Sequence, residues 1–211
     1  IIVNSHEFKK EFWRELNIKT EYIFNPLNSI QIKKLSKQKI KNSFFSKNSL
    51  KIITVGRLVD QKDHFTLLKA VNIIKKNINF RLIIIGEGEK KNSLQRFINE
   101  NKLKKCIKIM HYTNNPFPYI KQADIFVLSS LFEGLPNVLL EAILLKNFII
   151  SSNCKTGPKE ILDYGKGGLL FKIGNYRDLA NKILFYKNNR SMCNKKKKIA
   201  INRLNRFNYK K

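Results

Sequence analysis

From residue 50 onward, the hydrophobic positions of the chain alternate between two kinds of segment. Short, continuous apolar runs, typical of fully buried strands, are separated by segments in which apolar residues recur at helical spacing. The expected strands are 51–55, 80–85, 106–110, 124–129, 148–151 and 168–171. The expected helices are 64–76, 89–101, 116–123, 136–145, 158–162 and 176–186. This alternation predicts an α/β fold, a Rossmann-like doubly wound parallel sheet with helices on both faces.

The two ends of the chain follow a different pattern. Residues 5–16 carry aromatic side chains on one helical face, and residues 22–27 indicate a short strand that ends in a turn. The polar, lysine-rich stretch 29–49 predicts a surface connection, and 195–207 predicts a basic terminal helix. We therefore expect four parts of the chain, with the bounds 1–28, 29–49, 50–190 and 191–211.

The composition fits a folded domain. The chain has 211 residues and 24.8 kDa, and 43% of its residues are hydrophobic, which is enough to bury a sizeable core. Its longest apolar runs end at charged residues, well before the roughly 20 residues that a membrane span needs. The three cysteines have no metal-like spacing, so we expect free thiols in a reducing cytoplasm. Because the chain starts at Ile1 without a signal-peptide pattern, we expect a fragment of a longer protein.

The net charge of +27 would attract nucleic acid, an anionic lipid surface or a phosphorylated substrate. Lysine, asparagine and isoleucine are all abundant, which is the bias that AT-rich codons produce, so much of this charge is expected on solvated surface. The chain has neither zinc-finger spacing nor an aromatic RNA-stacking signature. Charge alone therefore leaves a nucleic-acid-binding module open as an alternative.

The stretch 132–141 connects an expected strand to an expected helix through a turn of only a few residues. Proline is favoured at the first helical position, so we expect Pro136 to begin the helix. The backbone N–H groups of Asn137, Val138 and Leu139 would then point back toward the turn. Those donors and the positive end of the helix dipole predict a site for a phosphate.

Two carboxylates flank this expected phosphate site. Glu133 precedes it, and Glu141 follows about 7 to 8 Å along the helix axis from Pro136. One carboxylate could therefore contact a sugar on one side of a diphosphate while the other contacts a ribose. The spacing itself is weak evidence, because Glu7 and Glu15 are separated by the same number of positions in an ordinary amphipathic segment.

Loops that follow the carboxyl ends of parallel strands meet at one edge of a sheet, where ligands bind. Glycines in these loops allow the backbone to approach a ligand closely, and Arg57 with Lys62 would bring two cations to the phosphate site. The loop residues that we expect at this edge are Gly56, Arg57, Lys62, Gly86, Glu87, Gly88, His111, Tyr112, Thr113, Glu133, Gly134, Thr156 and Gly157.

Four ordered motifs lie in the part of the chain from about Lys51 to Leu184. They are Val-Gly-Arg-Leu with the downstream lysine (55–62), Ile-Ile-Gly-Glu-Gly (84–88), Ala-Asp-Ile-Phe-Val-Leu-Ser-Ser (123–130) and Glu-Gly-Leu-Pro-Asn-Val-Leu-Leu-Glu-Ala (133–142). With these motifs the chain resembles the C-terminal, nucleotide-sugar-binding domain of retaining GT-B glycosyltransferases of family 4. Asn25-Pro26-Leu27 resembles the interdomain linker of these enzymes, so 1–28 is similar to the end of their acceptor-binding N-terminal domain.

The resemblance implies roles for individual residues. Arg57 and Lys62 would hold the diphosphate, Glu133 would contact the transferred sugar, Glu141 the ribose hydroxyls, and the loop with Tyr112 and Thr113 the nucleobase. Glu133, Arg57 and Lys62 are thus the expected catalytic residues. The expected donor-binding residues are Gly56, Arg57, Lys62, Gly86, Tyr112, Thr113, Glu133, Gly134, Leu135, Asn137, Val138 and Glu141. The chain has no Asp-any-Asp metal motif, so we expect no cofactor and metal-independent transfer.

The expected function is transfer, with retention, of a hexose or N-acetylhexosamine from a nucleotide diphosphate sugar, especially a UDP-sugar. The acceptor would be a glycan or a lipid-linked glycan in surface polysaccharide or glycoconjugate synthesis. The run 156–161 resembles members that extend bacterial surface glycans. The expected location is the cytoplasm, peripherally at the inner face of the cell membrane. A nucleic-acid-binding module and a relative of GT-B sugar-nucleotide epimerases are the alternatives.

Overall fold

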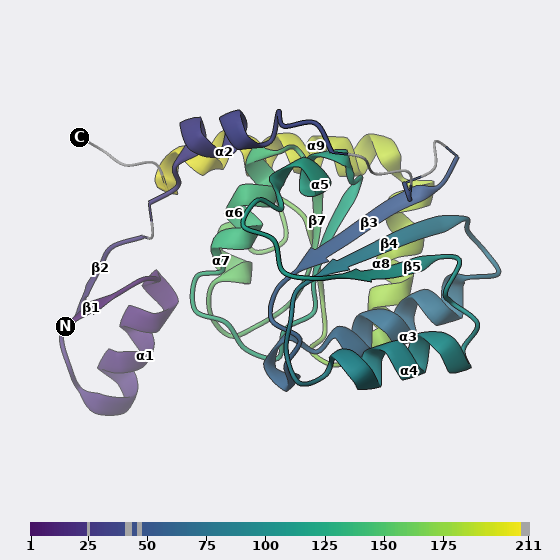
Figure 1. The fold of residues 1–211 in the computed structure, drawn as a ribbon. Coiled ribbons are helices and arrows are strands. Elements are labelled where there is room, and N and C mark those ends of the chain that lie inside the picture. Colours follow the sequence, from purple (N-terminus) through teal and green to yellow (C-terminus); the bar gives the residue numbers. More distant parts are fainter. Residues whose placement is uncertain (25, 41–43, 46–47, 208–211) are drawn as a thin grey trace.

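A six-stranded parallel sheet forms the centre of the structure, a computed structural model that describes residues 1–24, 26–40, 44–45 and 48–207 (Figure 1). Its strands are β3 (Leu50–Val55), β4 (Phe80–Ile85), β5 (Ile107–Met110), β6 (Ile125–Leu128), β7 (Phe148–Ser152) and β8 (Leu169–Phe171). Their order is β5-β4-β3-β6-β7-β8, so the direction of winding reverses between β3 and β6. The predicted doubly wound sheet is confirmed, and the reversal places a ligand crevice at the carboxyl ends of β3 and β6.

Helices cover both faces of the sheet. One face packs against α3 (His64–Ile74), α4 (Lys91–Glu100) and α8 (Tyr176–Asn188). The other packs against α2 (Ser29–Leu35), α5 (Phe117–Gln122), α6 (Asn137–Leu144), α7 (Pro158–Ile161) and α9 (Arg190–Arg203), which continues as the 3₁₀ helix η2 (Leu204–Phe207). Successive strand residues alternate between the two faces, so Ile52 belongs to one core cluster and Ile53 to the other. Figure 1 shows the two helical layers on opposite sides of the strands.

The first 24 residues form a small unit at one side of the sheet (Figure 1). Helix α1 (His6–Leu16) is capped by Ser5, whose hydroxyl accepts a hydrogen bond from the Phe8 N–H at 3.1 Å. Two short parallel strands, β1 (Ile2–Val3) and β2 (Glu21–Tyr22), flank the helix. The strand expected over 22–27 is therefore confined to its first residue, and Asn25 of the expected linker lies outside the described residues.

The structure corrects one expectation about the terminal segments and refines the bounds of another. Part of the stretch read as a surface connection, 29–49, forms α2, which packs against α5 and α6. Its apolar face is too short for a periodic pattern, because Ile32 is its one buried residue. The expected basic terminal helix is present, but it begins at Arg190 rather than at Lys195, and it buries Cys193 and Ala200 in the core. The basic helix is thus part of the sheet domain.

Within the described residues, no helix is both long and apolar enough to cross a membrane.

Candidate functional site

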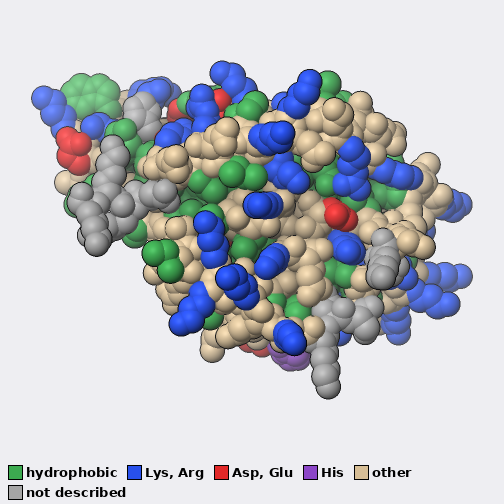
Figure 2. Space-filling view, turned by 90° about the horizontal axis from the view of Figure 1, so that it is seen from above, with side chains coloured by type: hydrophobic (Ala, Val, Ile, Leu, Met, Phe, Trp, Pro, Cys, Tyr) green, Lys and Arg blue, Asp and Glu red, His purple; other side chains and the backbone are tan. Residues whose placement is uncertain are grey.

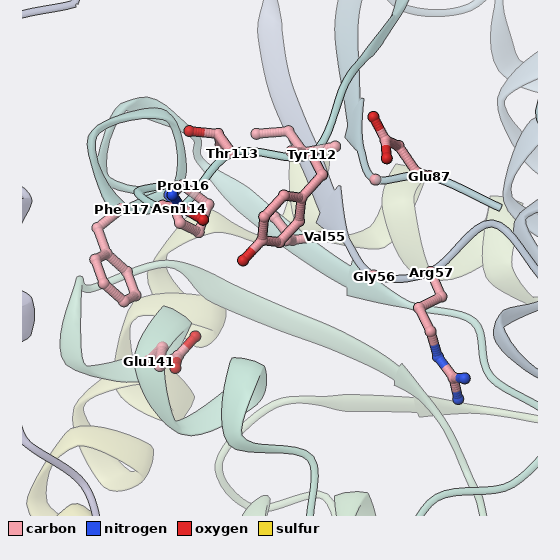
Figure 3. A pocket seen from close by; sticks show the side chains of 12 residues that line it. Val55, Gly56, Arg57, Glu87, Tyr112, Thr113, Asn114, Pro116, Phe117 and Glu141 are labelled. Atoms are coloured by element: carbon pink, nitrogen blue, oxygen red, sulfur yellow. The ribbon is translucent and has the colours of Figure 1, made fainter.

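A cavity of about 510 Å³ opens at the carboxyl ends of β3, β4 and β5 (Figure 3). The loops after these strands and one side chain of α6 form its wall. The lining residues are Val55, Gly56, Arg57, Ile85, Gly86, Glu87, Tyr112, Thr113, Asn114, Pro116, Phe117 and Glu141. The structure therefore brings together six of the residues expected to bind the donor: Gly56, Arg57, Gly86, Tyr112, Thr113 and Glu141.

The floor of the cavity depends on close backbone contacts between loops. A Cβ atom on Gly86 would lie 1.9 Å from the carbonyl oxygen of Gly56, so only glycine fits there. A Cβ atom on Gly56 would lie 3.7 Å from three carbon atoms of the Lys62 side chain. The aliphatic part of Lys62 therefore lies directly beside the floor of the cavity.

Planar side chains and one carboxylate border the other end of the cavity. In Figure 3, Phe117 and Glu141 lie on one side of the cavity, Arg57 lies on the other, and Tyr112 projects between them. Tyr112 is 66% exposed, so its ring is available to a ligand. Burial raises the pKa of the Glu141 carboxyl group. Ligand hydroxyl groups that donate to this carboxylate would offset its desolvation.

Lys62 and Glu133 form an ion pair next to the cavity. The Lys62 Nζ atom lies 2.5 Å from the Glu133 Oε1 atom, and the two side chains are only 17% and 7% exposed. Lys62 ends the 3₁₀ helix η1 (Asp60–Lys62) after β3, whereas Glu133 lies in the loop after β6. The pair therefore spans the point where the sheet reverses its winding, as expected for a ligand site of this fold.

Contacts from the loop after β7 fix the turn that contains Glu133. The Thr156 hydroxyl donates a hydrogen bond to the Glu133 carbonyl oxygen. Gly157 has a φ of 77°, and a Cβ atom there would lie 1.8 Å from the Gly134 carbonyl oxygen. Asn4 of the N-terminal unit lies on the other side of the turn, with its amide 3.4 Å from a Cβ atom placed on Gly134. The N-terminal unit thus reaches the site itself.

Charged contacts hold α1 against the loops beside this turn. Lys155 forms ion pairs with Glu11 and Glu15 of α1, and the Tyr164 hydroxyl donates to Glu7 at 3.0 Å. Glu7 and Glu15, whose spacing matches that of Glu133 and Glu141, therefore make structural contacts.

The backbone at Arg57 is held by neighbouring side chains, whereas its guanidinium group is exposed. The Arg57 Nη2 atom donates to Gln61 Oε1 at 3.2 Å, and the Gln61 amide donates to the Phe132 carbonyl oxygen at 3.0 Å. His64 Nε2 lies 3.2 Å from the Arg57 carbonyl oxygen. Because burial lowers the pKa of His64 to about 4, the imidazole is neutral near pH 7 and positions the loop without adding charge.

The start of α6 differs from our expectation. Pro136 has an extended backbone conformation and caps the helix, which begins at Asn137. The Leu139 N–H donates to the Pro136 carbonyl oxygen at 3.0 Å, so it is not available to a phosphate. Leu135 is buried in the core, and Val138 packs against the same cluster. Neither residue presents a side chain to the cavity, so any donor contact there would use backbone atoms.

Sequence reasoning missed several residues that line or support the site. Asn114 and Pro116 in the loop after β5, together with Phe117 at the start of α5, also line the cavity wall, and they follow residues that we had placed there. The rule that identified Tyr112 and Thr113 would have found Asn114 if it had been applied along the whole loop, whereas Pro116 and Phe117 fall in the expected helix 116–123. The supporting contacts of Gln61, His64 and Ser130 depend on side-chain geometry and leave no pattern in the sequence.

Comparisons with known proteins agree with this architecture. The family described as Glycosyl transferases group 1 matches residues 36–203. An uncharacterized glycosyltransferase of Methanocaldococcus jannaschii is 36% identical over 191 residues, which are 82% of this chain and 47% of the relative. A 4-alpha-N-acetylgalactosaminyltransferase of Campylobacter jejuni, named for an acceptor linked to diphospho-undecaprenol, is 31% identical over 159 residues, which are 74% of this chain and 41% of the relative.

A solved structure shows the same fold. The structure of HepE from Anabaena in complex with UDP matches with a TM-score of 0.84 and 20% sequence identity, over 98% of this chain and 59% of that chain. The structural neighbours are GT-B glycosyltransferases, which confirms the predicted fold class. The chain spans about half the length of the curated relatives that it matches. From the family match and the identity to these relatives, we conclude that the chain belongs to the Glycosyl transferases group 1 family.

Proposed function

We propose that the chain is the donor-binding half of a retaining glycosyltransferase of family 4. The enzyme transfers a hexose or N-acetylhexosamine from a nucleotide diphosphate sugar, with a UDP-sugar as the favoured donor. The acceptor is a glycan or lipid-linked glycan in surface polysaccharide synthesis. The relatives support this proposal by their names, which include a transferase for a diphospho-undecaprenol acceptor and a poly(ribitol-phosphate) N-acetylglucosaminyltransferase.

One observation carries the proposal. Lys62 lies between the cavity floor and Glu133, and Arg57 belongs to both the cavity and the same loop. A nucleoside in the cavity, near Tyr112 and Glu141, would place its diphosphate toward these two cations. The transferred sugar would then lie beside Glu133. This order of groups is the one that a nucleotide diphosphate sugar requires.

The charges suit the chemistry of transfer. The bond between the anomeric carbon and the phosphate oxygen breaks, the oxygen of an acceptor hydroxyl group forms a new bond to that carbon, and the hydroxyl proton passes to the leaving nucleoside diphosphate. Negative charge grows on the leaving phosphate while positive charge grows on the sugar. Arg57 and Lys62 would stabilise the first charge and Glu133 the second.

A binding experiment tests the proposal against the nucleic-acid alternative. We expect UDP and UDP-sugars to raise the melting temperature of the chain and to retain most of their affinity between 50 and 200 mM salt. A mixed-sequence RNA held by many lysines should lose its affinity steeply over the same range. RNA binding that withstands salt, together with no response to any nucleotide sugar, would favour the alternative. A panel of UDP-, GDP- and dTDP-sugars in the same assay identifies the donor.

Chelators are expected to leave transfer by the enzyme that contains this chain largely intact. In the proposed site, Arg57 and Lys62 take the place of a metal in neutralising the leaving phosphate. Among the described residues, no group of three His, Cys, Asp or Glu side chains could share a metal ion. Turnover should be measured with and without EDTA. Loss of turnover that magnesium or manganese restores would contradict the expectation.

A basic surface on the side of α2 and α9 leads us to propose peripheral binding to an anionic membrane. Figure 2 views this side and shows many lysine and arginine side chains with few acidic ones. Segments 29–40 and 190–207 contain no Asp or Glu, and both contain exposed lysines. Lysines close to an anionic surface contribute about 1 kcal/mol each.

Neutralising two exposed lysines of α9, Lys195→Gln with Lys198→Gln, is expected to weaken binding to anionic liposomes about 30-fold at low salt. Truncation of α9 is unsuitable because the helix is packed into the core. Lys104→Gln with Lys105→Gln removes the same charge from exposed positions before β5 and is the matched control. Equal binding by both variants in a liposome sedimentation assay would reject the surface on α9.

A further inference from the structure

The Glu133 carboxylate is held on one side only. Its Oε1 atom accepts a hydrogen bond from the Ser130 hydroxyl at 2.6 Å and lies 2.5 Å from the Lys62 ammonium group. Within the described part of the chain, Oε2 makes no hydrogen bond to a protein group. The side chain is 7% exposed, so these contacts set its orientation in a nearly closed environment. One oxygen atom is fixed by the protein, and the other remains for a ligand.

Ser130 is itself firmly placed. The residue is completely buried just beyond the end of β6. Its carbonyl oxygen accepts a hydrogen bond from the Ser152 hydroxyl at 2.6 Å and another from the Cys154 thiol at 3.2 Å. Both donors belong to β7 or the loop that follows it, and β7 pairs with β6 in the sheet. Ser130, whose hydroxyl orients Glu133, is thus held in place by its position after β6 and by hydrogen bonds from the end of β7 to its carbonyl oxygen.

Lys62 cannot orient the Glu133 carboxylate throughout the reaction. If a diphosphate binds near Lys62, its oxygen atoms compete with Glu133 for the ammonium group. A buried carboxylate that loses its partner is strongly disfavoured. The Ser130 hydroxyl carries no charge and donates to the same Oε1 atom, so it would keep Oε1 paired while Lys62 turns toward the phosphate.

We propose that Ser130 is a positioning residue of the transfer reaction: its hydroxyl fixes the Glu133 carboxylate so that Oε2 faces the donor sugar when Lys62 engages the diphosphate. This inference rests on the proposed function, in which Glu133 contacts the transferred sugar. Ser130 acts through Glu133 and does not itself touch the substrate. Its effect should therefore appear in turnover rather than in nucleotide affinity.

Ser152 provides a matched control. Its hydroxyl is also completely buried in the same cluster, but it donates to a backbone carbonyl group and not to Glu133. Ser130→Ala and Ser152→Ala each remove one buried hydroxyl, the first just beyond the end of β6 and the second at the end of β7. A purely structural contribution would give similar effects in the two variants, whereas a positioning role predicts different ones.

Steady-state kinetics of the enzyme that contains this chain test the proposal. We expect Ser130→Ala to lower kcat about tenfold or more, because a hydrogen bond to a charged group is lost. The KM for the donor and the Kd for UDP should change less than about twofold. Ser152→Ala should leave kcat within about threefold of the wild-type value, since Cys154 still donates to the Ser130 carbonyl oxygen.

A double-mutant cycle with Glu133→Gln separates positioning from folding. A neutral amide accepts a weaker hydrogen bond than a carboxylate, so Ser130→Ala should cost at least about threefold less in the Glu133→Gln background. UDP binding and the melting temperature of each variant verify folding. If Ser130→Ala does not fold, Ser130→Cys replaces it, because a thiol is similar in size but a weak donor.

Two outcomes overturn the inference alone. In the first, Ser130→Ala and Ser152→Ala lower kcat equally; in the second, Ser130→Ala costs the same in both backgrounds. Either would show that Ser130 contributes only to the fold. Wild-type turnover by Glu133→Gln is a different result, because it would remove Glu133 from the proposed function and the inference with it.

Discussion

The variant Glu133→Gln should lower kcat roughly 30-fold or more while changing the KM for the donor only slightly. The change keeps the shape of the side chain but removes its charge. Positive charge develops on the sugar only as its bond to the phosphate breaks, so the missing interaction belongs to the transition state. A loss of about 2 kcal/mol in the transition state corresponds to that reduction in rate.

The variant Glu141→Gln should have the opposite profile, a KM for the donor raised about tenfold with kcat nearly unchanged. Glu141 lies in the wall of the cavity, away from the Lys62–Glu133 pair. A contact with ribose hydroxyls is the same in the ground and transition states, so its loss weakens binding uniformly. Because burial raises the pKa of this carboxyl group, donor affinity should also fall as the pH decreases through that raised value.

Initial-rate measurements of both variants in the enzyme that contains this chain distinguish the two roles. Glu100→Gln removes an exposed carboxylate at the end of α4 and is the control for a general loss of negative charge. Equal effects of Glu133→Gln and Glu141→Gln on kcat would show that the roles are assigned wrongly. A kcat defect confined to Glu141→Gln would reverse them.

The sequence predicts the six strands and the edge where the site lies for a simple physical reason. In a parallel sheet covered on both faces, strands are continuous apolar runs, so each strand end is visible as a change from apolar to polar residues. The fold then brings the loops that follow these strands to one edge. Gly56, Gly86, Tyr112 and Thr113 were found in this way and meet in the cavity.

The interactions inside the site are not visible in the sequence, because they join distant positions through side-chain geometry. Lys62 and Glu133 are separated by 71 positions, and their ion pair depends on the order of β3 and β6 in the sheet. The Ser130 hydroxyl lies only 3 positions from Glu133, yet serines are too common in loops to indicate this contact. The helix α2 was not predicted for another reason: a single buried isoleucine gives no helical periodicity of hydrophobic residues.

The Lys62–Glu133 pair also determines how the cation variants should behave. Arg57→Ala removes an exposed guanidinium group, whose contact within the protein is with Gln61. Because the variant would lose a charged contact with the diphosphate, it should weaken UDP binding by this chain about tenfold. Lys62→Ala removes a phosphate contact and also leaves the Glu133 charge close to the diphosphate. We therefore expect a larger loss, about 100-fold, for Lys62→Ala.

Calorimetric titration of UDP into this chain at low salt measures both losses, and two further variants show their origin. Lys76→Ala removes an exposed lysine just beyond the C-terminal end of α3 and should change the affinity less than about twofold, because a distant surface charge is largely screened. Adding Glu133→Gln to Lys62→Ala should recover part of the affinity, because it removes the repulsive carboxylate. Unchanged affinity in both Arg57→Ala and Lys62→Ala would refute the phosphate assignment. Similar losses in Lys62→Ala and Lys76→Ala would instead attribute the binding to the overall charge of the chain.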